Sequence, residues 1–238
     1  MRALRTFVIA ALLATAGWTS ANTTERVDLL LVLAVDVSGS VDEQKFQLQR
    51  LGYAAAFSDP RVIQAIRAGP SGRIAVAYIE FSGIVLQKLV IDWTVISNED
   101  TARQFSNHIL EAPRAFVKNS TSISAGIDFA VTQFDRAPYQ APRRTIDVSG
   151  DGDNNAGRDV TAARDDAVAK GVTTNGLVIV TEAQTPSKSD HTNPPGGLAN
   201  YYRNNVIGGP GAFVTAAENI NSFGNALIHK LIREIALR

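Results

Sequence analysis

The chain has 238 residues, of which 45% are hydrophobic and 19% charged, so it can bury one sizeable core and is not expected to be disordered. Its 23 basic and 23 acidic side chains balance, which offers no positively charged surface, and we expect no nucleic-acid partner. Without cysteine, the chain cannot form disulfide bonds, thiolate nucleophiles, iron–sulfur clusters or cysteine-ligated zinc sites.

The first 21 residues have the features of a secretory signal peptide. Arg2 and Arg5 precede an apolar stretch at 7–13, and small residues lead to an expected cleavage site after Ala21. The apolar stretch is too short to span a bilayer, which takes about 20 residues, and no later run is long enough. We therefore expect an exported protein, periplasmic or secreted, whose mature chain at 22–238 is a single domain without a membrane span.

Predicted strands and helices alternate along the rest of the chain. The apolar run at 29–35, between Asp28 and Asp36, is typical of a strand buried on both faces of a parallel sheet. A helical pattern follows at 41–57. Further strands are predicted at 73–81, 88–93, 144–149, 173–180 and 211–216, and further helices at 98–111, 122–134, 158–170 and 220–237.

This alternation predicts an α/β fold: a three-layer sandwich with a mostly parallel central sheet and helices on both faces. One connection differs, because the segment from Phe81 to Lys88 is too short for a crossover helix and predicts a hairpin. The strand at 88–93 is therefore expected to be antiparallel and to lie at an edge of the sheet. A long irregular stretch at 185–210 is rich in Pro, Gly and Asn.

Oxygen-bearing side chains follow two predicted strands and precede one helix. Asp36, Ser38 and Ser40 follow the first strand. Asp151 follows a later strand, and Thr121 precedes a helix. Because ligands of open parallel sheets bind beyond the carboxyl ends of the strands, we expect these side chains to gather at one edge. Their carboxylate and hydroxyl oxygens suit Mg²⁺, Mn²⁺ or Ca²⁺ better than zinc or copper.

The pattern resembles the metal-ion-dependent adhesion site (MIDAS) of von Willebrand factor type A (VWA) domains. The resemblance extends from about Val27 to Leu237. The chain is similar in particular to uncharacterised exported bacterial proteins of VWA type. The matching residues are Asp36, Ser38 and Ser40 in the first loop, Thr121, Ile123, Gly126 and Ile127 in the second, and Asp151 and Gly152 in the third. The resemblance implies a Rossmann-like VWA domain.

The resemblance also implies an octahedral divalent ion, Mg²⁺ or Mn²⁺ with Ca²⁺ as an alternative. Ser38, Ser40 and Thr121 would ligate this ion. Asp36 and Asp151 would bind it directly or through water. An open sixth position would capture an Asp or Glu carboxylate of a protein partner, so the implied function is a non-catalytic, metal-dependent adhesion-type module.

The third loop departs from the family pattern. The family more often has Thr directly before the aspartate, whereas Ser149 and Gly150 precede Asp151 here. Either the contribution of this threonine beside the ligands is lost, or Ser149 replaces part of it.

Two other functions use the same residues. Asp36 lies where the nucleophile of an aspartyl or metal-assisted phosphohydrolase would lie, but Ser38 stands where such an enzyme has its second carboxylate. No candidate phosphate-binding lysine stands out. Alternatively, the ion merely holds the loops together and has a structural role.

Several polar residues near the motifs have simpler interpretations. Ser40 and Glu43 match a helix capping box. Asp153 and Asn155 are expected to form turns. The three histidines complete no triad pattern and are expected on the surface or in packing roles; they are His108, His191 and His229.

Three further features lie on or after predicted strands. Asp147 is unusual inside a strand and is expected to pair with Arg143 or Arg144. Glu182 follows a predicted strand and is expected to be a solvated loop acid, with a place beside the metal edge as the alternative. The stretch at 185–210 is expected to shape the partner surface around the ion.

Overall fold

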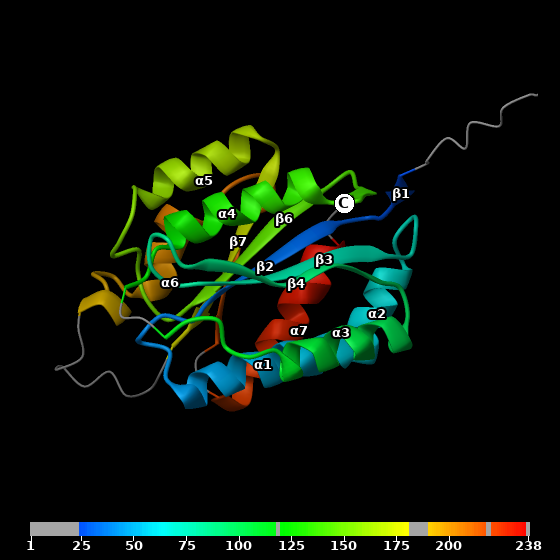
Figure 1. The fold of residues 1–238 in the computed structure, drawn as a ribbon, viewed down its shortest axis with the longest axis horizontal. Coiled ribbons are helices and arrows are strands. Elements are labelled where there is room, and N and C mark those ends of the chain that lie inside the picture. The colour runs from blue at the N-terminus through cyan, green and yellow to red at the C-terminus, as the bar shows by residue number, and fades with distance from the viewer. Residues whose placement is uncertain (1–23, 118–119, 181–189, 218–219, 237–238) are drawn as a thin grey trace, which may run out of the picture.

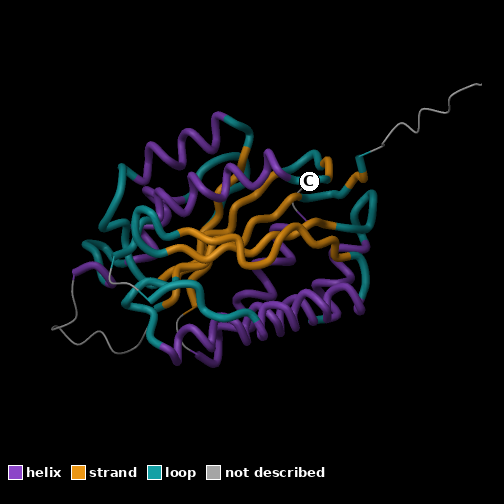
Figure 2. The backbone as a smooth tube through the Cα atoms, in the orientation of Figure 1, coloured by secondary structure: helices purple, strands orange, loops and turns teal. Residues whose placement is uncertain are grey.

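The structure is a computed structural model that describes residues 24–117, 120–180, 190–217 and 220–236. A central sheet lies between two layers of helices (Figures 1 and 2). This arrangement confirms the predicted three-layer α/β sandwich. The expected signal peptide and Glu182 lie outside the described residues, as does part of the stretch at 185–210.

The central sheet of the described chain has six strands in the order β4-β3-β2-β6-β7-β8. Its pairs are parallel except for β3 with β4, which confirms the predicted hairpin and the antiparallel edge strand. The strands are β2 (Leu30–Asp36), β3 (Ile74–Phe81), β4 (Gln87–Ile96), β6 (Arg144–Gly150), β7 (Val172–Ile179) and β8 (Val214–Ala217). A small parallel pair, β1 (Glu25–Arg26) with β5 (Tyr139–Gln140), was not predicted.

Helices cover both faces of the sheet (Figure 1). On one face lie α4 (Ile123–Arg136) and α5 (Val160–Ala169). On the other lie α1 (Glu43–Ser58), α2 (Pro60–Arg67), α3 (Glu99–Glu111) and α7 (Ile220–Ala236). The chain between β7 and β8 carries a 3-10 turn (Asp190–Thr192), α6 (Leu198–Tyr201) and a π-helical turn (Tyr202–Val206).

The continuous apolar run of β2 is explained by cover on both faces. Leu31 and Leu33 belong to the core beneath α1 and α7, whereas Val32 and Ala34 belong to the core beneath α4, and all four are fully buried. Alternate side chains of a strand point to opposite faces, so a strand covered on both sides must be apolar at every position.

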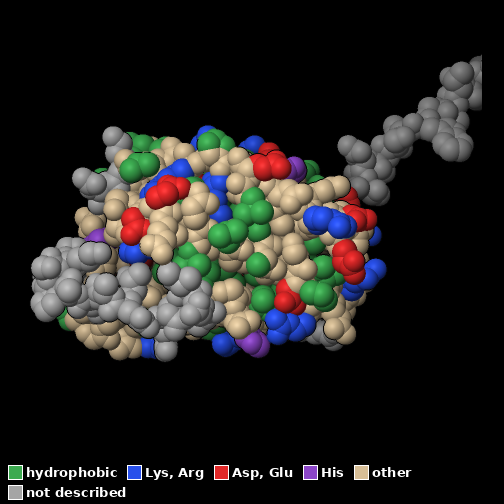
Figure 3. Space-filling view, turned by 90° about the horizontal axis from the view of Figure 1, so that it is seen from below, with side chains coloured by type: hydrophobic (Ala, Val, Ile, Leu, Met, Phe, Trp, Pro, Cys, Tyr) green, Lys and Arg blue, Asp and Glu red, His purple; other side chains and the backbone are tan. Residues whose placement is uncertain are grey.

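Figure 3 shows the molecule from below the view of Figure 1, and acidic and basic side chains lie close together on that face.

None of the helices in the described part of the chain is long and apolar enough to cross a membrane.

The helix α1 begins later than the capping-box interpretation predicted. Asp42 is its N-cap and accepts a hydrogen bond from the backbone nitrogen of Lys45 at 2.8 Å. The predicted pairing of Ser40 with Glu43 is therefore wrong. The Ser40 hydroxyl donates instead to Asp151, a contact between segments distant in the sequence that a local pattern does not reveal.

The expected partner of Asp147 is also wrong. Lys230 of α7, not Arg143 or Arg144, lies 2.7 Å from the Asp147 carboxylate, and it also contacts Glu234. All three side chains of this cluster are fully buried. Burial raises the pKa of Asp147, and it raises the pKa of Glu234 to about 7. The charge of the Lys230 ammonium acts in the opposite direction and stabilises the ionised form of both acids inside the core.

We predict that Lys230→Met lowers the free energy of unfolding by about 3–5 kcal/mol, because it leaves two buried acids facing each other without a counter-charge. Urea denaturation measures the loss. Lys170→Met, at an exposed lysine beyond α5, is the matched control and should stay within about 0.5 kcal/mol of the wild type. Equal denaturation midpoints for the two variants would contradict the prediction.

Candidate metal centre

The first and third loops of the candidate site are brought together by two neighbouring parallel strands. The strands β2 and β6 pair in register, with Val35 opposite Ser149, so their carboxyl ends lie side by side. Asp36 is the last residue of β2, and Asp151 directly follows β6. The second loop enters α4, and it reaches the same edge because α4 packs on the sheet.

The close packing of α4 depends on Gly126. A Cβ atom at this position would lie 2.8 Å from the Phe81 ring at the end of β3. Glycine therefore lets the first turns of α4 approach the sheet edge. A backbone bond from the Ser122 nitrogen to the Ser82 carbonyl, at 2.7 Å, fixes the loop before the helix.

All five predicted site residues meet at this edge in one continuous polar chain. Asp36 Oδ1 accepts a hydrogen bond from the Ser38 nitrogen at 2.8 Å. Thr121 Oγ1 donates to Ser38 Oγ at 2.7 Å, and Ser38 Oγ lies 3.3 Å from Ser40 Oγ. Ser40 Oγ donates to Asp151 Oδ1 at 2.5 Å. These five side chains are called the oxygen cluster below.

Four of the five residues of the oxygen cluster are buried, Ser40 is half-buried, and one carboxylate oxygen lacks a partner. Asp36, Ser38 and Thr121 are fully buried and Asp151 is 2% exposed. Asp36 Oδ2 finds no hydrogen-bond partner among the described residues. Burial, and then the charge of Asp151, raise the pKa of Asp36 to about 7. An orphaned buried carboxylate oxygen beside a second acid and three hydroxyls fits a hard divalent cation.

Asparagine side chains tie the second loop to the third. Thr121 donates its backbone N–H to Asn155 Oδ1 at 2.8 Å, and the Asn155 nitrogen donates back to the Thr121 carbonyl at 3.0 Å. Asn154 Oδ1 accepts from the Ser124 nitrogen at 2.9 Å. Asn155, expected only to form a turn, thus positions Thr121.

The third loop departs from the family pattern at Gly150, and the structure shows that a side chain at this position would meet its neighbours. Gly150 occupies the position directly before Asp151, and a Cβ there would lie 2.6 Å from the Tyr202 hydroxyl and 3.1 Å from Asp36 Oδ2. Tyr202 is fully buried, and burial followed by the Asp36 charge raises its pKa. Ser149 lies near Tyr53 of α1 rather than in the oxygen cluster.

Two residues beside the oxygen cluster, Lys45 and His191, were not predicted from the sequence. Lys45 Nζ lies 2.6 Å from Asp151 Oδ2 and donates to the Ser40 carbonyl at 2.8 Å. His191 Nε2 lies 3.2 Å from Thr121 Oγ1, and its Nδ1 contacts the Asp153 carboxylate. Neither residue stands in a local motif, so only the tertiary fold reveals them.

The other two histidines, His108 of α3 and His229 of α7, are exposed, as expected. Within the described ranges no group of three or more His, Asp or Glu side chains is arranged to hold a metal ion, so an ion at this edge would also need the hydroxyls as ligands.

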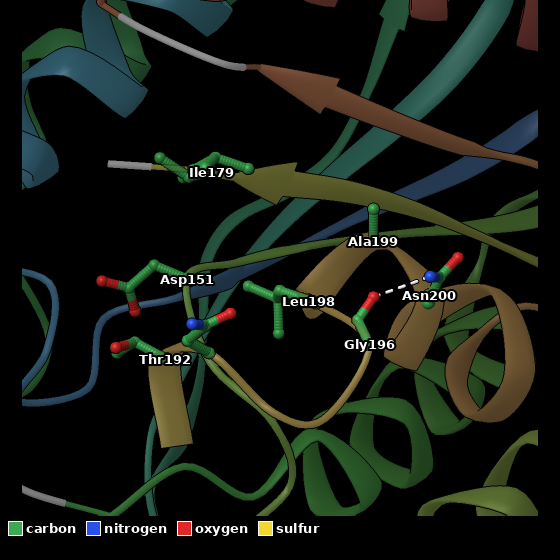
Figure 4. A pocket seen from close by; sticks show the side chains of 10 residues that line it. Asp151, Ile179, Thr192, Gly196, Leu198, Ala199 and Asn200 are labelled. Carbon is green, nitrogen blue, oxygen red and sulfur yellow. Dashed lines mark hydrogen bonds between the residues drawn. The ribbon is translucent and has the colours of Figure 1, made fainter. Parts of the chain in front are cut away.

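A cavity of about 260 Å³ adjoins Asp151. It is bordered by Ile179 and Val180 at the end of β7 and by residues of the 192–200 segment. Figure 4 shows Asp151 and Thr192 at one end of this cavity and Gly196 and Asn200 at the other. The described part of the irregular stretch therefore borders the oxygen cluster, as expected from the position of β7.

The chain belongs to the family described as "Protein of unknown function (DUF1194)", whose model matches residues 26–238. No curated protein sequence matches it significantly.

Solved structures show that the fold is of VWA type. Proximal thread matrix protein 1 from the mussel byssus has a TM-score of 0.61 and 14% identity over 89% of this chain and 48% of its own. A von Willebrand factor type A protein from Catenulispora acidiphila has a TM-score of 0.54 and 13% identity over 88% of this chain and 42% of its own. The pilus adhesin SpaC from Lactobacillus rhamnosus GG has a TM-score of 0.59 and 13% identity over 88% and 31%.

This chain therefore spans about half or less of the length of these three proteins. A further structure of the mussel protein has a zinc-occupied MIDAS motif, with a TM-score of 0.57 and 12% identity over 90% of this chain and 47% of that one.

We predict that Asp36→Asn stabilises the metal-free protein at pH 8 by about 1–3 kcal/mol, because it removes a buried charge that lacks a full set of partners. The raised pKa of Asp36 sets the pH dependence. The folded wild type binds this proton more tightly than the unfolded chain, so its stability falls as pH rises from about 4 to about 7. The advantage of the variant should grow over the same window.

Urea denaturation in the presence of a chelator measures this effect. Asp165→Asn, at an exposed acid of α5, is the matched control and should show no such pH-dependent gain. A destabilised Asp36→Asn protein at pH 8 would show that the carboxylate is satisfied without an ion.

Proposed function

We propose that this member of the DUF1194 family is an exported, non-catalytic module that binds a protein partner through a divalent metal ion. The observation that carries the proposal is the oxygen cluster: two acids and three hydroxyls from three loops, nearly all buried, with one carboxylate oxygen orphaned. A zinc-occupied MIDAS in the mussel matrix protein and the VWA-type fold shared with a pilus adhesin support it.

The chemistry of the oxygen cluster assigns the roles. The hydroxyls of Ser38, Ser40 and Thr121 would hold the ion as neutral ligands, with Asp36 and Asp151 bound directly or through water. Mg²⁺ or Mn²⁺ suits this set best, with Ca²⁺ as the alternative. When bound, the ion supplies a Lewis-acidic position for an outside oxygen ligand. The chain's own residues orient the hydroxyls and bury the two acids.

The proposed partner is a protein that offers an Asp or Glu carboxylate. Neutral hydroxyl ligands leave the ion's charge less compensated than a full set of carboxylates would, which favours an anion at an open position. The cavity beside Asp151 and the 190–210 segment would shape the surface that the partner covers.

We predict that Mg²⁺ or Mn²⁺ binds the mature, chelator-stripped protein at one ion per chain, and that Asp36→Ala abolishes this binding. Isothermal titration calorimetry measures both. Asp165→Ala is the matched control and should bind like the wild type, because its carboxylate lies on the exposed side of α5.

Two outcomes would contradict the proposal. Unchanged ion affinity in Asp36→Ala would place the ion elsewhere. Metal-dependent hydrolysis of p-nitrophenyl phosphate that disappears in Asp36→Asn would favour the phosphohydrolase alternative.

Export is a separate prediction. When residues 1–238 are expressed in a bacterial host, the exported chain should begin at Asn22, because cleavage is expected after Ala21. N-terminal sequencing of the secreted or periplasmic protein tests this. A chain that keeps Met1 would contradict it.

A further inference from the structure

Lys45 places a positive charge directly against the oxygen cluster. Its ammonium lies 2.6 Å from Asp151 Oδ2 and 2.8 Å from the Ser40 carbonyl oxygen. The Lys45 side chain is 13% exposed and that of Asp151 only 1%. The pair is therefore shielded from solvent, where a charge interaction is stronger than at an open surface.

The fold holds Lys45 in this place. Asp42 caps α1, which puts Lys45 on the first turn, where side chains lean back toward the helix start. The next residue, Phe46, is buried, and the guanidinium groups of Arg50 and Arg114 lie over its ring at 4.4 and 4.8 Å. The start of α1 is thus anchored, and the ammonium is directed at the third loop.

Both carboxylate oxygens of Asp151 are engaged by the chain itself. Oδ1 accepts from the Ser40 hydroxyl at 2.5 Å, and Oδ2 contacts Lys45. A hydroxyl can rotate to offer its oxygen to an ion, but an ammonium has three donors and no acceptor. Lys45 therefore competes with a cation for Asp151.

Arg114 differs from Lys45 although it is also close. Its guanidinium donates to the carbonyl oxygens of Val37, Ser38 and Val41 at 2.6 to 3.2 Å, and its nearest carboxylate contact is Glu43 at 4.0 Å. These bonds fix the backbone of the first loop. The Arg114 charge acts on Asp36 and lowers the pKa of its carboxyl, against the burial and the Asp151 charge that raise it, but its hydrogen bonds go to backbone carbonyls.

We propose that Lys45 is a built-in counter-charge that weakens binding of the divalent ion and strengthens binding of an anion to the loaded site. This inference rests on the proposed function. If only the two acids and the Lys45 ammonium in contact with Asp151 are counted, the site carries one net negative charge, and a divalent ion makes it net positive. Without Lys45, the same ion would only neutralise the site. The ligand class is therefore a carboxylate, in preference to a neutral amide.

The first test is calorimetric titration of Mn²⁺ into the mature protein. Lys45→Met should bind Mn²⁺ at least about ten-fold more tightly than the wild type, because a competing charge in contact with Asp151 is gone. Lys45→Arg keeps the charge and should stay near the wild type. Lys170→Met, which removes an exposed charge beyond α5, is the matched control and should also be unchanged.

The second test loads the same proteins with Mn²⁺ and titrates acetate, with acetamide as the neutral probe. Binding of either probe displaces metal-bound water, and water proton relaxation measures this displacement. Acetate should bind the wild type several-fold more tightly than Lys45→Met, on the order of the Coulomb effect of one shielded charge. Acetamide should not distinguish the two proteins.

The outcomes separate this inference from the proposed function. Equal Mn²⁺ affinity in the wild type and Lys45→Met would overturn the role of Lys45 and leave the metal site standing. Tighter Mn²⁺ binding with unchanged acetate affinity would overturn its role in anion capture. No Mn²⁺ binding by any of the four proteins, each folded by circular dichroism, would overturn the proposed function as well.

Discussion

Parallel pairing of β2 with β6 is the interaction on which the candidate site depends. Because these strands are hydrogen-bonded in register, Asp36 and Asp151 emerge at the same edge although they are far apart in the sequence. Close packing of β2 on both faces favours this register, since a slip of one residue would move every side chain into the other core, where its shape would not fit. The packing of α4 on β3, permitted at Gly126, then delivers the hydroxyl of Thr121 to the same place.

A second set of interactions connects the core to the loops through buried charge. Arg50 of α1 lies 2.9 Å from Glu80 of β3, and both side chains are almost fully buried. The other oxygen of Glu80 accepts from the Ala115 nitrogen at 2.7 Å, which fixes the segment that carries Arg114. Arg114 in turn holds the carbonyls of the first loop. The geometry of this loop is thus secured by a chain of contacts that begins inside the core.

The sequence was sufficient where the physical signal is local. Alternation of apolar runs with helical patterns predicted the sandwich and its edge strand, and the spacing of Asp36, Ser38 and Ser40 after a buried strand placed the first loop. It failed where a partner comes from a distant segment. Lys230 approaches Asp147 from the last helix, and His191 reaches Thr121 from beyond β7. The distance in sequence between Lys230 or His191 and its partner does not predict the contact, because only tertiary packing brings the two residues together.

In the proposed function, the balance of charge at the oxygen cluster links affinity for an ion to recognition of a partner. A site that surrounded a divalent ion with more carboxylates would hold it more tightly, but it would also cancel the charge that an outside carboxylate needs. Three hydroxyls lower the ligand charge, and Lys45 offsets one of the two acids that remain. The burial of Asp36 raises the cost of leaving its charge unpaired, which favours occupation of the site. Lys45 therefore opposes tight metal binding, whereas the buried, unpaired charge of Asp36 promotes it. In the proposed function, the net positive charge of the loaded site would be available to a partner's carboxylate.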